Sequence, residues 1–530
     1  MLNRLTPPLT LRSSQRSRRL SAGAAFLIGL VTLSVFPALA QESQQTALER
    51  RIRSILNENV ARQAHVGVEV VSLRTGKRIA AIDPDKRFVP ASTAKLFPAA
   101  AALARLAPDF KYRTTVETAA AVTPDGRVQG DLALVGRGDP NLSGRVLPYN
   151  GTTERVRPPT LAFDDLAAQV ARRGVHIVEG NLVVDNTYFV SQPFGQGWTL
   201  DDLQWGYGAP VTALALNDNV IVFRIRPGAR AGAPVLIELE PPTTRFQIEN
   251  KVLTVERNRR SPASARQLTI DRRPGSTVAR LWGEIREGSP EWSGALAMDD
   301  PAPIAGEVFR DALSRNKIEV RGTIRTRELY PAEVADLERT DPPRPAGATV
   351  LATLDSLPLA DSLKVILKVS QNLHAEMLLR TLGRERRGVG SVEAGLSEIA
   401  EFLKETGINP DDVLVRDGSG LSRQNLVTPS AMTALLRAMY DSPHRDLWLD
   451  LLPVAGTDGS LQNRLNGRAV AARVRAKTGG LAGVSALAGY APNASGDLLA
   501  FTIFINHHNL TPGPATGLID RIVREITASR

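Results

Sequence analysis

The pattern of apolar residues changes twice along this 530-residue chain, and the two changes constrain its fold. Between about Tyr112 and Ala346, short apolar or β-branched runs alternate with Gly, Pro, Asn and Asp, as is typical of strands and turns. On either side of this segment, helical periodicity dominates, with strand patterns near both ends. The chain is longer than one hydrophobic core usually organises. We therefore expect the outer portions to form one α/β domain, interrupted by the strand-rich middle.

The outer portions contain most of the expected helices. Residues 47–64 have helical apolar spacing, and an Ala-rich helix is expected from Phe88 to Ala107, with an irregularity at Pro98. Residues 67–73 and 78–83 predict a β-hairpin. Later helices are expected at residues 363–382, 391–406, 428–440 and 514–528, the last after two strand patterns. In the middle portion, strands are expected at 132–140, 181–186, 220–228 and 318–324, and helices at 161–173 and 305–315.

The first forty residues have the pattern of an export signal. Five arginines precede the apolar stretch 22–36: Arg4, Arg12, Arg16, Arg18 and Arg19. Ala38-Leu39-Ala40 then matches a cleavage site, which predicts a periplasmic or extracytoplasmic protein. An uncleaved anchor is the alternative, for which the stretch is short. The twin-arginine route is a second alternative to general secretion, on the pair Arg18-Arg19.

Charge and composition exclude several function classes. Removing residues 1–40 takes five arginines and no acid from a net charge of +10, leaving +5. This mild excess suits an anionic wall or lipid headgroups and argues little for nucleic acid. The chain has no Cys and six scattered His, so a disulfide framework is excluded and a zinc hydrolase is disfavoured.

Ser92 and Lys95 form the first of three short motifs. They lie three residues apart at the start of a helical pattern, which puts their side chains on one face with Cβ atoms about 5 to 6 Å apart. A lysine whose pKa is lowered by burial, or by a second cation such as Lys477, is a base able to activate a serine. The Ser92 N–H is then a candidate oxyanion donor. The alternative is a helix-capping serine beside a solvated lysine.

Ser370 and Asn372 form the second motif, within the apolar-periodic run KVILKVSQNLHAEML. Residues two apart on a helix point in different directions, so a helix break is needed to aim both into a cleft. We expect Ser370 to relay a proton to the leaving amine, and the Asn372 amide to bind substrate and hold Lys95. Two polar residues on an exposed helix face are the alternative.

Lys477, Thr478, Gly479 and Gly480 form the third motif, at the start of a predicted β-hairpin. Such a strand can pair with an extended peptide, while the glycines allow close backbone approach. We expect Lys477 and Thr478 to bind a terminal carboxylate and the Gly480 N–H to be the second oxyanion donor. An ordinary Gly-rich turn with an exposed lysine is the alternative.

The three motifs in this order resemble those of penicillin-binding proteins and β-lactamases. Their flanks resemble the D-alanyl-D-alanine carboxypeptidase/endopeptidases of the PBP4 (DacB) type, peptidase family S13. The matching segments are VPASTAKLF (89–97), GRGDPNLS (136–143), GAPVTALALNDN (208–219), RDGSGLSRQNLVTP (416–429) and AGTDGSLQNRL (455–465). The first two motifs are 370 minus 92, or 278, residues apart, as in a family whose catalytic domain is interrupted by two further domains.

The resemblance implies a β-lactamase/transpeptidase-like catalytic domain, residues 41–112 and 349–530, with an antiparallel sheet flanked by helices. The mostly-β insertions are then residues 113–190 with 319–348, and residues 191–318. It implies cleavage of D-Ala-D-Ala termini or D,D cross-links of peptidoglycan stem peptides through an acyl-enzyme on Ser92, and covalent inhibition by β-lactams. It implies no metal or organic cofactor, no nucleic acid, and at most peripheral membrane contact.

Three positions qualify the resemblance. Gln371 stands where many relatives carry Asp. Leu481 resembles a position lining the pocket for the stem-peptide side chain, and Asp185 resembles an acid that binds the amino group of diaminopimelate, although an Asx-turn explains Asp185 equally well. A serine β-lactamase and a catalytically silent wall-binding protein remain the rival functions. The sequence does not distinguish carboxypeptidase from endopeptidase activity.

Overall fold

The computed structural model describes residues 45–58, 63–151, 157–260, 268–273, 275–331, 347–468 and 470–530. The predicted signal segment, residues 1–40, lies outside the described residues. Residues 45–530 form one compact unit, and the proposed division of this unit into three domains remains a prediction.

A five-stranded antiparallel sheet unites both ends of this unit. Its order is β19 (Arg475–Leu481), β20 (Val484–Pro492), β21 (Leu498–Asn506), β1 (His65–Ser72) and β2 (Arg78–Ile82). Strand β1 pairs with β21 along its whole length, from His65 opposite Asn506 to Ser72 opposite Leu499. The expected joining of the N- and C-terminal portions is therefore confirmed, and β19 is left at an edge of the sheet.

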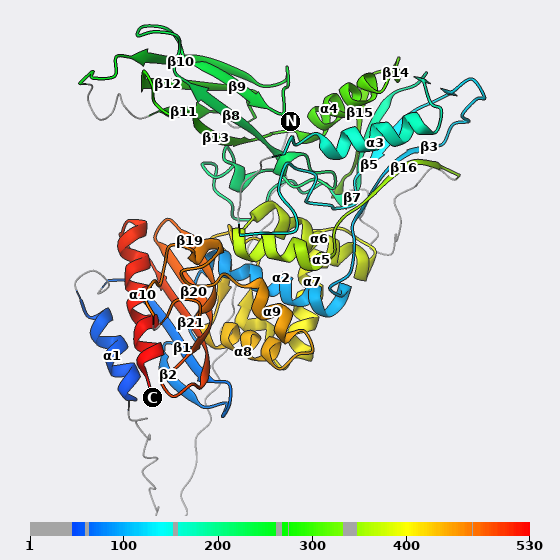
Figure 1. The fold of residues 1–530 in the computed structure, drawn as a ribbon. Helices are drawn as coiled ribbons and strands as arrows, with labels where there is room; N and C mark the ends of the chain where they lie inside the picture. Colours follow the sequence, from blue (N-terminus) through cyan, green and yellow to red (C-terminus); the bar gives the residue numbers. More distant parts are fainter. Residues whose placement is uncertain are drawn as a thin grey trace, which may run out of the picture. The chain divides into compact units, whose positions relative to one another are not determined.

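The alternation of side chains along these strands gives the sheet two buried faces. In β21, Ala500 and Phe504 belong to one hydrophobic core, while Phe501 and Ile503 belong to the other. Helices α1 (Ala47–Leu56) and α10 (Pro512–Ala528) cover one face (Figure 1). The other face packs on a helical layer: α2 (Leu96–Leu106), α5 (Leu359–Lys364), α6 (Asn372–Arg387), α7 (Val392–Glu405), α8 (Pro429–Tyr440) and α9 (Arg445–Leu451).

Local sequence signals explain where several of these helices begin. The side chain of Ser391 accepts the Ala394 N–H at the start of α7, and that of Thr428 accepts the Ala431 N–H at the start of α8. These are N-caps, which satisfy backbone donors that have no partner in the first helical turn. The predicted helix 47–64 was too long, because α1 ends at Leu56 and is followed by Asn57 as its C-cap.

The middle of the chain is mostly strand, as expected. Strands β15 (Ile324–Leu329), β7 (Leu182–Val190), β5 (Leu132–Val135), β3 (Arg113–Thr118) and β16 (Thr349–Asp355) form one sheet, with α3 (Leu161–Arg172) and α4 (Pro301–Arg315) packed on it. Two three-stranded sheets follow: β10 (Gln247–Val255), β12 (Val278–Arg286) and β11 (Thr269–Arg272), then β13 (Trp292–Ala297), β8 (Val220–Arg226) and β9 (Leu236–Glu240). Short strands β14 (Glu319–Val320), β6 (Ile177–Val178) and β4 (Arg127–Val128) form another sheet, and β17 (Val413–Leu414) pairs with β18 (Leu426–Val427).

The single strand predicted at residues 318–324 is divided into β14 and β15, which belong to different sheets. The chain changes sheets at Gly322, where an added Cβ would lie 2.3 Å from the Gly180 carbonyl oxygen. Only glycine allows this approach of two backbones, so the interruption is built into the sequence.

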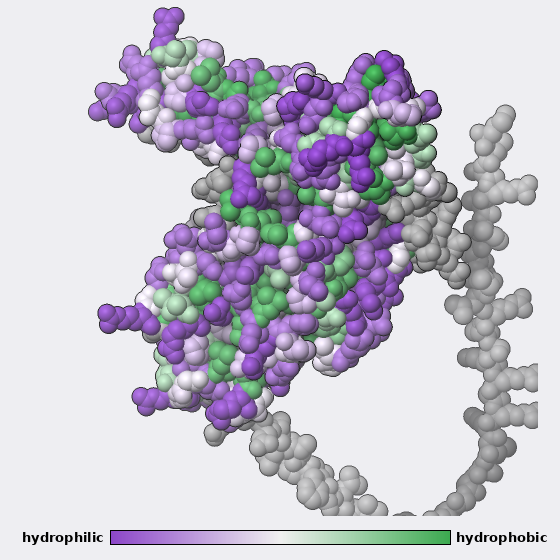
Figure 2. Space-filling view, turned by 45° about the vertical axis from the view of Figure 1, so that its right-hand side comes forward, coloured by the Kyte–Doolittle hydropathy of each residue, from purple (hydrophilic) through white to green (hydrophobic). Residues whose placement is uncertain are grey.

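The visible surface is largely polar. Figure 2 shows hydrophilic residues over most of the face that it presents, with hydrophobic ones in small groups. The exposed large apolar side chains include Leu236, Leu253 and Trp282 on the strands of the middle portion. Among the described residues, no helix combines the length and hydrophobicity needed to cross a bilayer.

Candidate active site

Ser92 and Lys95 lie in one turn of 3₁₀-helix, η1 (Ala91–Lys95), immediately before α2. Three residues per turn align their side chains, and Lys95 Nζ lies 2.9 Å from Ser92 Oγ. The Asn506 side chain fixes the approach to this turn, because it accepts the Val89 N–H and donates to the Val89 carbonyl. The helix irregularity expected at Pro98 lies one turn earlier, where η1 is a 3₁₀-helix. Pro98 itself falls in the first turn of α2, where a backbone N–H has no partner within the helix, so its absence does not weaken α2.

The Lys95 amine is completely buried and has three oxygen neighbours. In addition to Ser92 Oγ, Nζ contacts Asn372 Oδ1 at 2.7 Å and the Ser419 carbonyl oxygen at 2.5 Å. Burial lowers the pKa of Lys95 to about 7, against the opposing charges of Asp417 and Glu376. Near neutral pH, a large fraction of Lys95 is therefore an uncharged amine able to accept a proton.

The second motif lies at the expected helix break. One turn of π-helix, η5 (Val365–Val369), ends at Ser370, which has φ 68° and ψ 34°, and α6 starts at Asn372. Gln371 is extended, and its side chain caps α6 by accepting the Leu373 N–H. Asp is among the preferred capping residues, so Gln371 performs a local task open to either residue type.

This break aims Ser370 and Asn372 at different lysines. Ser370 Oγ accepts from Lys477 Nζ at 2.8 Å, and Asn372 Oδ1 accepts from Lys95. The Asn372 amide N–H donates to the Tyr207 carbonyl oxygen at 2.8 Å, which fixes the orientation of the amide. Asn372 therefore bridges Lys95 and a segment of the middle portion.

The third motif lies on the edge strand β19. Lys477 is fully buried, and burial, followed by the charge of Lys95, lowers its pKa well below the usual value. Thr478 Oγ1 donates to Ser460 Oγ at 2.7 Å. An added Cβ on Gly479 would lie 2.7 Å from the Pro90 carbonyl oxygen, so the close approach expected there exists. At Gly480 an added Cβ would meet no atom of the protein within 4 Å, so the space beside it is open, and its role in the approach of a substrate backbone stays a prediction.

The contacts join three widely separated segments into one polar group: Ser92 and Lys95 from η1, Ser370 and Asn372 from the helix break, and Lys477 from β19. A cavity of about 190 Å³ adjoins the second motif and is lined by Ser370, Asn372, Tyr207 and Arg145, among others. The sequence-predicted residues thus converge beside an open space shared with the middle portion.

The two remaining candidate residues, Leu481 and Asp185, form no hydrogen bond or ion pair with this polar group among the described residues. Leu481 is half-buried at the end of β19, opposite Val484. Asp185 Oδ1 accepts the backbone N–H and the hydroxyl of Thr187, as in an Asx-turn, and Oδ2 pairs with Arg327 at 3.0 Å. The sheet of β15, β7, β5, β3 and β16 is called the inserted sheet below, because its strands lie in the chain between β2 and β19. Asp185 lines a larger cavity on this sheet, about 930 Å³, whose lining includes no residue of the three motifs.

Sequence reasoning missed the acids beneath the site. Glu376 and Asp417 are fully buried, and both influence Lys95 electrostatically. One signal was available for Glu376, which is an acid inside the apolar run LHAEMLL and four residues before Arg380. Asp417 was part of the segment RDGSGLSR, whose Gly and Ser residues indicate a tight turn.

Comparison with known proteins identifies the family. Residues 48–525 match the family described as "D-Ala-D-Ala carboxypeptidase 3 (S13) family". This chain belongs to the S13 family. It is 35% identical over 502 residues to a D-alanyl-D-alanine carboxypeptidase of Actinomadura sp. (strain R39), covering 92% of this chain and 86% of that protein. The D-alanyl-D-alanine carboxypeptidase DacB of Haemophilus influenzae is 26% identical over 459 residues, covering 86% of this chain and 88% of DacB.

The fold comparison agrees with this assignment. The crystal structure of penicillin binding protein 4 (dacB) from H. influenzae superposes with a TM-score of 0.74 at 24% identity, covering 89% of this chain and 97% of that one. A second structure of the same protein, complexed with a β-lactam, gives 0.70 and covers 91% and 99%. The fold class expected from the sequence is confirmed.

Proposed function

We propose that this S13 protein is a serine D,D-peptidase that cleaves D-alanyl-D-alanine termini or D,D cross-links of peptidoglycan through an acyl-enzyme on Ser92. The observation that carries the proposal is the 2.9 Å contact between Ser92 Oγ and the buried Lys95 amine. A serine hydroxyl is a weak nucleophile at neutral pH, and it needs a base whose pKa lies near the working pH. Lys95 meets this requirement because its pKa is about 7.

In the acylation step, neutral Lys95 takes the proton of Ser92 as Oγ attacks the carbonyl carbon between two D-alanines. The backbone N–H groups of Ser92 and Gly480 are the proposed donors to the developing oxyanion. The C–N bond then breaks, and the proton that Lys95 took from Ser92 passes through Ser370, whose hydroxyl is linked to Lys477, to the departing D-alanine amine, so that Lys95 is neutral again. In deacylation, water attacks the ester carbonyl and gives its proton to Lys95. The C–O bond to Ser92 breaks, Lys95 returns the proton to Ser92 Oγ, and the shortened peptide leaves.

Recognition of the substrate uses its terminal carboxylate. Lys477 and Thr478 present an amine and a hydroxyl on the edge strand β19, and an extended peptide can pair with such an edge. An arriving carboxylate favours the ammonium form of Lys477, so substrate binding opposes the effect of burial on its pKa. Leu481, at the end of β19, is proposed to contact the stem-peptide side chain.

We also propose the division into a catalytic domain of residues 41–112 and 349–530, with insertions 113–190 plus 319–348 and 191–318. The protein is proposed to act outside the cytoplasm, on peptidoglycan stem peptides, with at most peripheral membrane contact. β-Lactams are proposed to acylate Ser92, in keeping with the β-lactam complex of the H. influenzae relative.

A fluorescent penicillin tests the function against the β-lactamase alternative. The peptidase is expected to retain about one label per chain for many minutes and to release D-alanine from a pentapeptide stem. Rapid turnover of the penicillin without a lasting adduct would favour a β-lactamase. No adduct and no D-alanine from a correctly folded protein would favour a silent wall-binding protein.

A further inference from the structure

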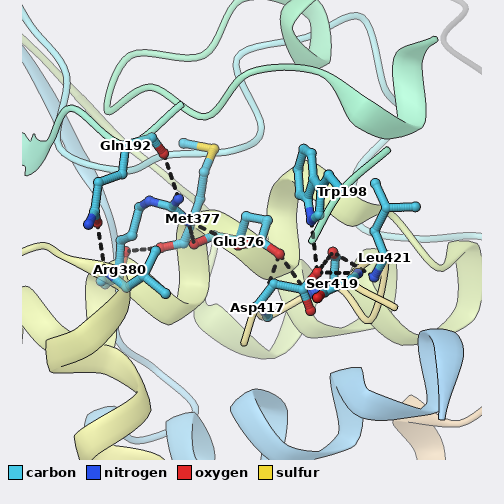
Figure 3. A network of polar contacts seen from close by, with 12 residues as sticks. Gln192, Trp198, Glu376, Met377, Arg380, Asp417, Ser419 and Leu421 are labelled. Atoms are coloured by element: carbon cyan, nitrogen blue, oxygen red, sulfur yellow. Dashed lines mark hydrogen bonds and ion pairs between the residues drawn. The ribbon is translucent and has the colours of Figure 1, made fainter. Parts of the chain in front are cut away.

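A tight loop after β17 is wound around the carboxylate of Asp417. Oδ1 accepts from the Gly420 N–H at 2.9 Å and the Asn425 amide at 2.7 Å. Oδ2 accepts from the Ser422 N–H at 2.7 Å and, at 2.9 Å, from the indole N–H of Trp198 (Figure 3). Asp417 is 1% exposed, so these donors have no water to replace the carboxylate oxygens, and the loop conformation depends on the Asp417 side chain.

Glu376 of α6 holds the same loop from the other side. Its Oε1 accepts both the Gly418 N–H at 2.9 Å and the Ser419 N–H at 2.8 Å. Its Oε2 pairs with Arg380 at 3.0 Å, and Arg380 in turn donates to the Gln192 carbonyl oxygen (Figure 3). Asp417 and Glu376 therefore both bind backbone N–H groups of the loop that contains the Ser419 carbonyl.

The Ser419 carbonyl oxygen is one of the three oxygen neighbours of Lys95 Nζ. A neutral amine has two N–H bonds and one lone pair. If the N–H bonds point to the Ser419 carbonyl and to Asn372 Oδ1, the lone pair faces the remaining neighbour, Ser92 Oγ. Both acceptors are held in place, Asn372 through its bond to Tyr207 and Ser419 through the two acids.

We propose that Glu376 and Asp417 are positioning residues for acylation: they hold the Ser419 carbonyl against one N–H of Lys95 and so direct the Lys95 lone pair at the Ser92 hydroxyl. This inference rests on the proposed function and deepens it. Both acids are buried beneath the site, so neither is proposed to touch substrate. Their action passes through the loop backbone and through their charge, so they affect both the aim of the base and its protonation.

The electrostatic part has a definite sign. The negative charges of Asp417 and Glu376 favour the ammonium form of Lys95, although Arg380 partly neutralises Glu376. Lys477 is the other ionisable group nearby, and the charge of Lys95 lowers the pKa of Lys477. Removing the charge of Asp417 lowers the pKa of Lys95 further. The pH at which acylation reaches half of its maximum then falls, while the maximum itself falls because the base is badly aimed.

Trp198 ties this loop to the middle portion of the chain. It lies in the segment that follows β7, and the Arg423 N–H donates to the neighbouring Gly197 carbonyl at 3.4 Å. Trp198→Phe removes one indole N–H from Asp417 and keeps a large aromatic ring. It therefore tests the same network with little risk to folding.

The test is the second-order rate constant for acylation by a fluorescent penicillin, measured against pH. For Asp417→Asn we expect a maximum lower by on the order of 100-fold, since misplaced catalytic groups cost about that much. We expect its midpoint to shift down by about one pH unit. For Trp198→Phe, loss of one hydrogen bond predicts a fall of about fivefold, with the midpoint little changed.

Glu398→Gln is the matched control, because Glu398 is a buried acid on α7 that pairs with Arg387 and Arg105 and is absent from the surroundings of Lys95. It is expected to keep the wild-type rate and midpoint. If folded Asp417→Asn and Trp198→Phe also keep both within twofold, the proposal is overturned.

A crystal structure of Asp417→Asn separates this inference from the proposed function. Displacement of the Ser419 carbonyl or of Lys95 Nζ away from the Ser92 contact supports the positioning role, and unchanged contacts overturn it. Failure of wild-type protein to form a penicillin adduct would instead overturn the function, whatever the contacts of Lys95 are.

Discussion

The active-site cleft is the polar group of Ser92, Lys95, Ser370, Asn372 and Lys477 together with the cavity beside it. Its two lysines are fully buried, and within the described residues neither forms an ion pair. On the inserted sheet, by contrast, buried acids lie against arginines: Glu117 is 2.6 Å from Arg137, and Asp185 is 3.0 Å from Arg327. A buried charge with a direct partner is stabilised as an ion, whereas an amine surrounded by hydroxyls and carbonyls loses part of its preference for the charged form. The difference separates charges that maintain structure from amines prepared to exchange protons.

The contacts of both regions join residues that are far apart along the chain. Lys95 contacts residues 277 and 324 positions away, and Lys477 contacts one 107 positions away. On the inserted sheet, Glu117 of β3 and Arg137, which follows β5, are 20 positions apart, and Asp185 and Arg327 are 142 positions apart. Both regions therefore form only when distant segments of the chain meet, and the cleft brings three such segments together.

Replacement of the nucleophile gives the largest expected effect. Ser92→Ala should lower D-alanine release from a pentapeptide stem by at least about 1,000-fold, because the covalent route is lost. Circular dichroism should be unchanged. The control is Ser397→Ala on α7, an exposed serine whose hydroxyl donates to the Glu393 carbonyl oxygen of its own helix. If folded Ser92→Ala kept its activity, the cleft would not be the reactive site.

Replacement of the carboxylate-binding lysine comes next. Lys477→Ala should reduce kcat/KM for the D-Ala-D-Ala terminus on the order of 100-fold, the range for a lost charge-assisted contact that is made in a buried site. Most of the loss should appear in KM or in the rate of penicillin acylation at low concentration. An unchanged acylation rate would show that Lys477 does not bind the substrate carboxylate.

The pH dependence of the wild-type protein sharpens the comparison further. Lys95 must be neutral to accept a proton, and its pKa is about 7. Acylation by penicillin should therefore rise with pH through about 7 and fall about tenfold for each pH unit below the midpoint. Stopped-flow fluorescence from pH 5 to 9 measures this. A flat profile, or a midpoint close to the ordinary lysine pKa, would contradict a base made reactive by burial.

The smallest effect is expected on the inserted sheet. Asp185→Asn removes the charge facing Arg327 but leaves an oxygen for the Asx-turn with Thr187. Because the Arg327 side chain is 41% exposed and water screens the pair, the loss of stability should be about 1 kcal/mol or less, measured by urea unfolding. Penicillin acylation and stem-peptide cleavage should stay within twofold of wild type. If Asp185→Asn lost stem-peptide cleavage but kept penicillin acylation, Asp185 would bind substrate. The charges of the inserted sheet would then serve function as well as structure.

Local pattern was sufficient to predict some parts of this molecule. The two strand patterns that became β20 and β21, the helices expected from residues 391 and 428, and the need for a helix break between Ser370 and Asn372 all follow from rules that act over a few residues. The membership of the three motifs in one site was predicted from their order and from resemblance.

Other parts depend on contacts that local pattern does not encode. The loop around Asp417 is fixed by Glu376 and by Trp198, which are 41 and 219 positions away, and no periodicity links these segments. The division of residues 318–324 between two sheets depends on the approach of Gly322 to Gly180. In both cases the decisive neighbour belongs to another segment, so its identity appears only in the folded chain.

The most direct measurement is the site of penicillin attachment. Trypsin cleavage after Arg87 and Lys95 gives the peptide FVPASTAK, which contains Ser92 and Thr93. If Ser92 is the nucleophile, tandem mass spectrometry of the labelled protein will find the penicilloyl mass on this peptide and on Ser92. A modification on Thr93, on Ser370 or on any peptide outside this segment would contradict it.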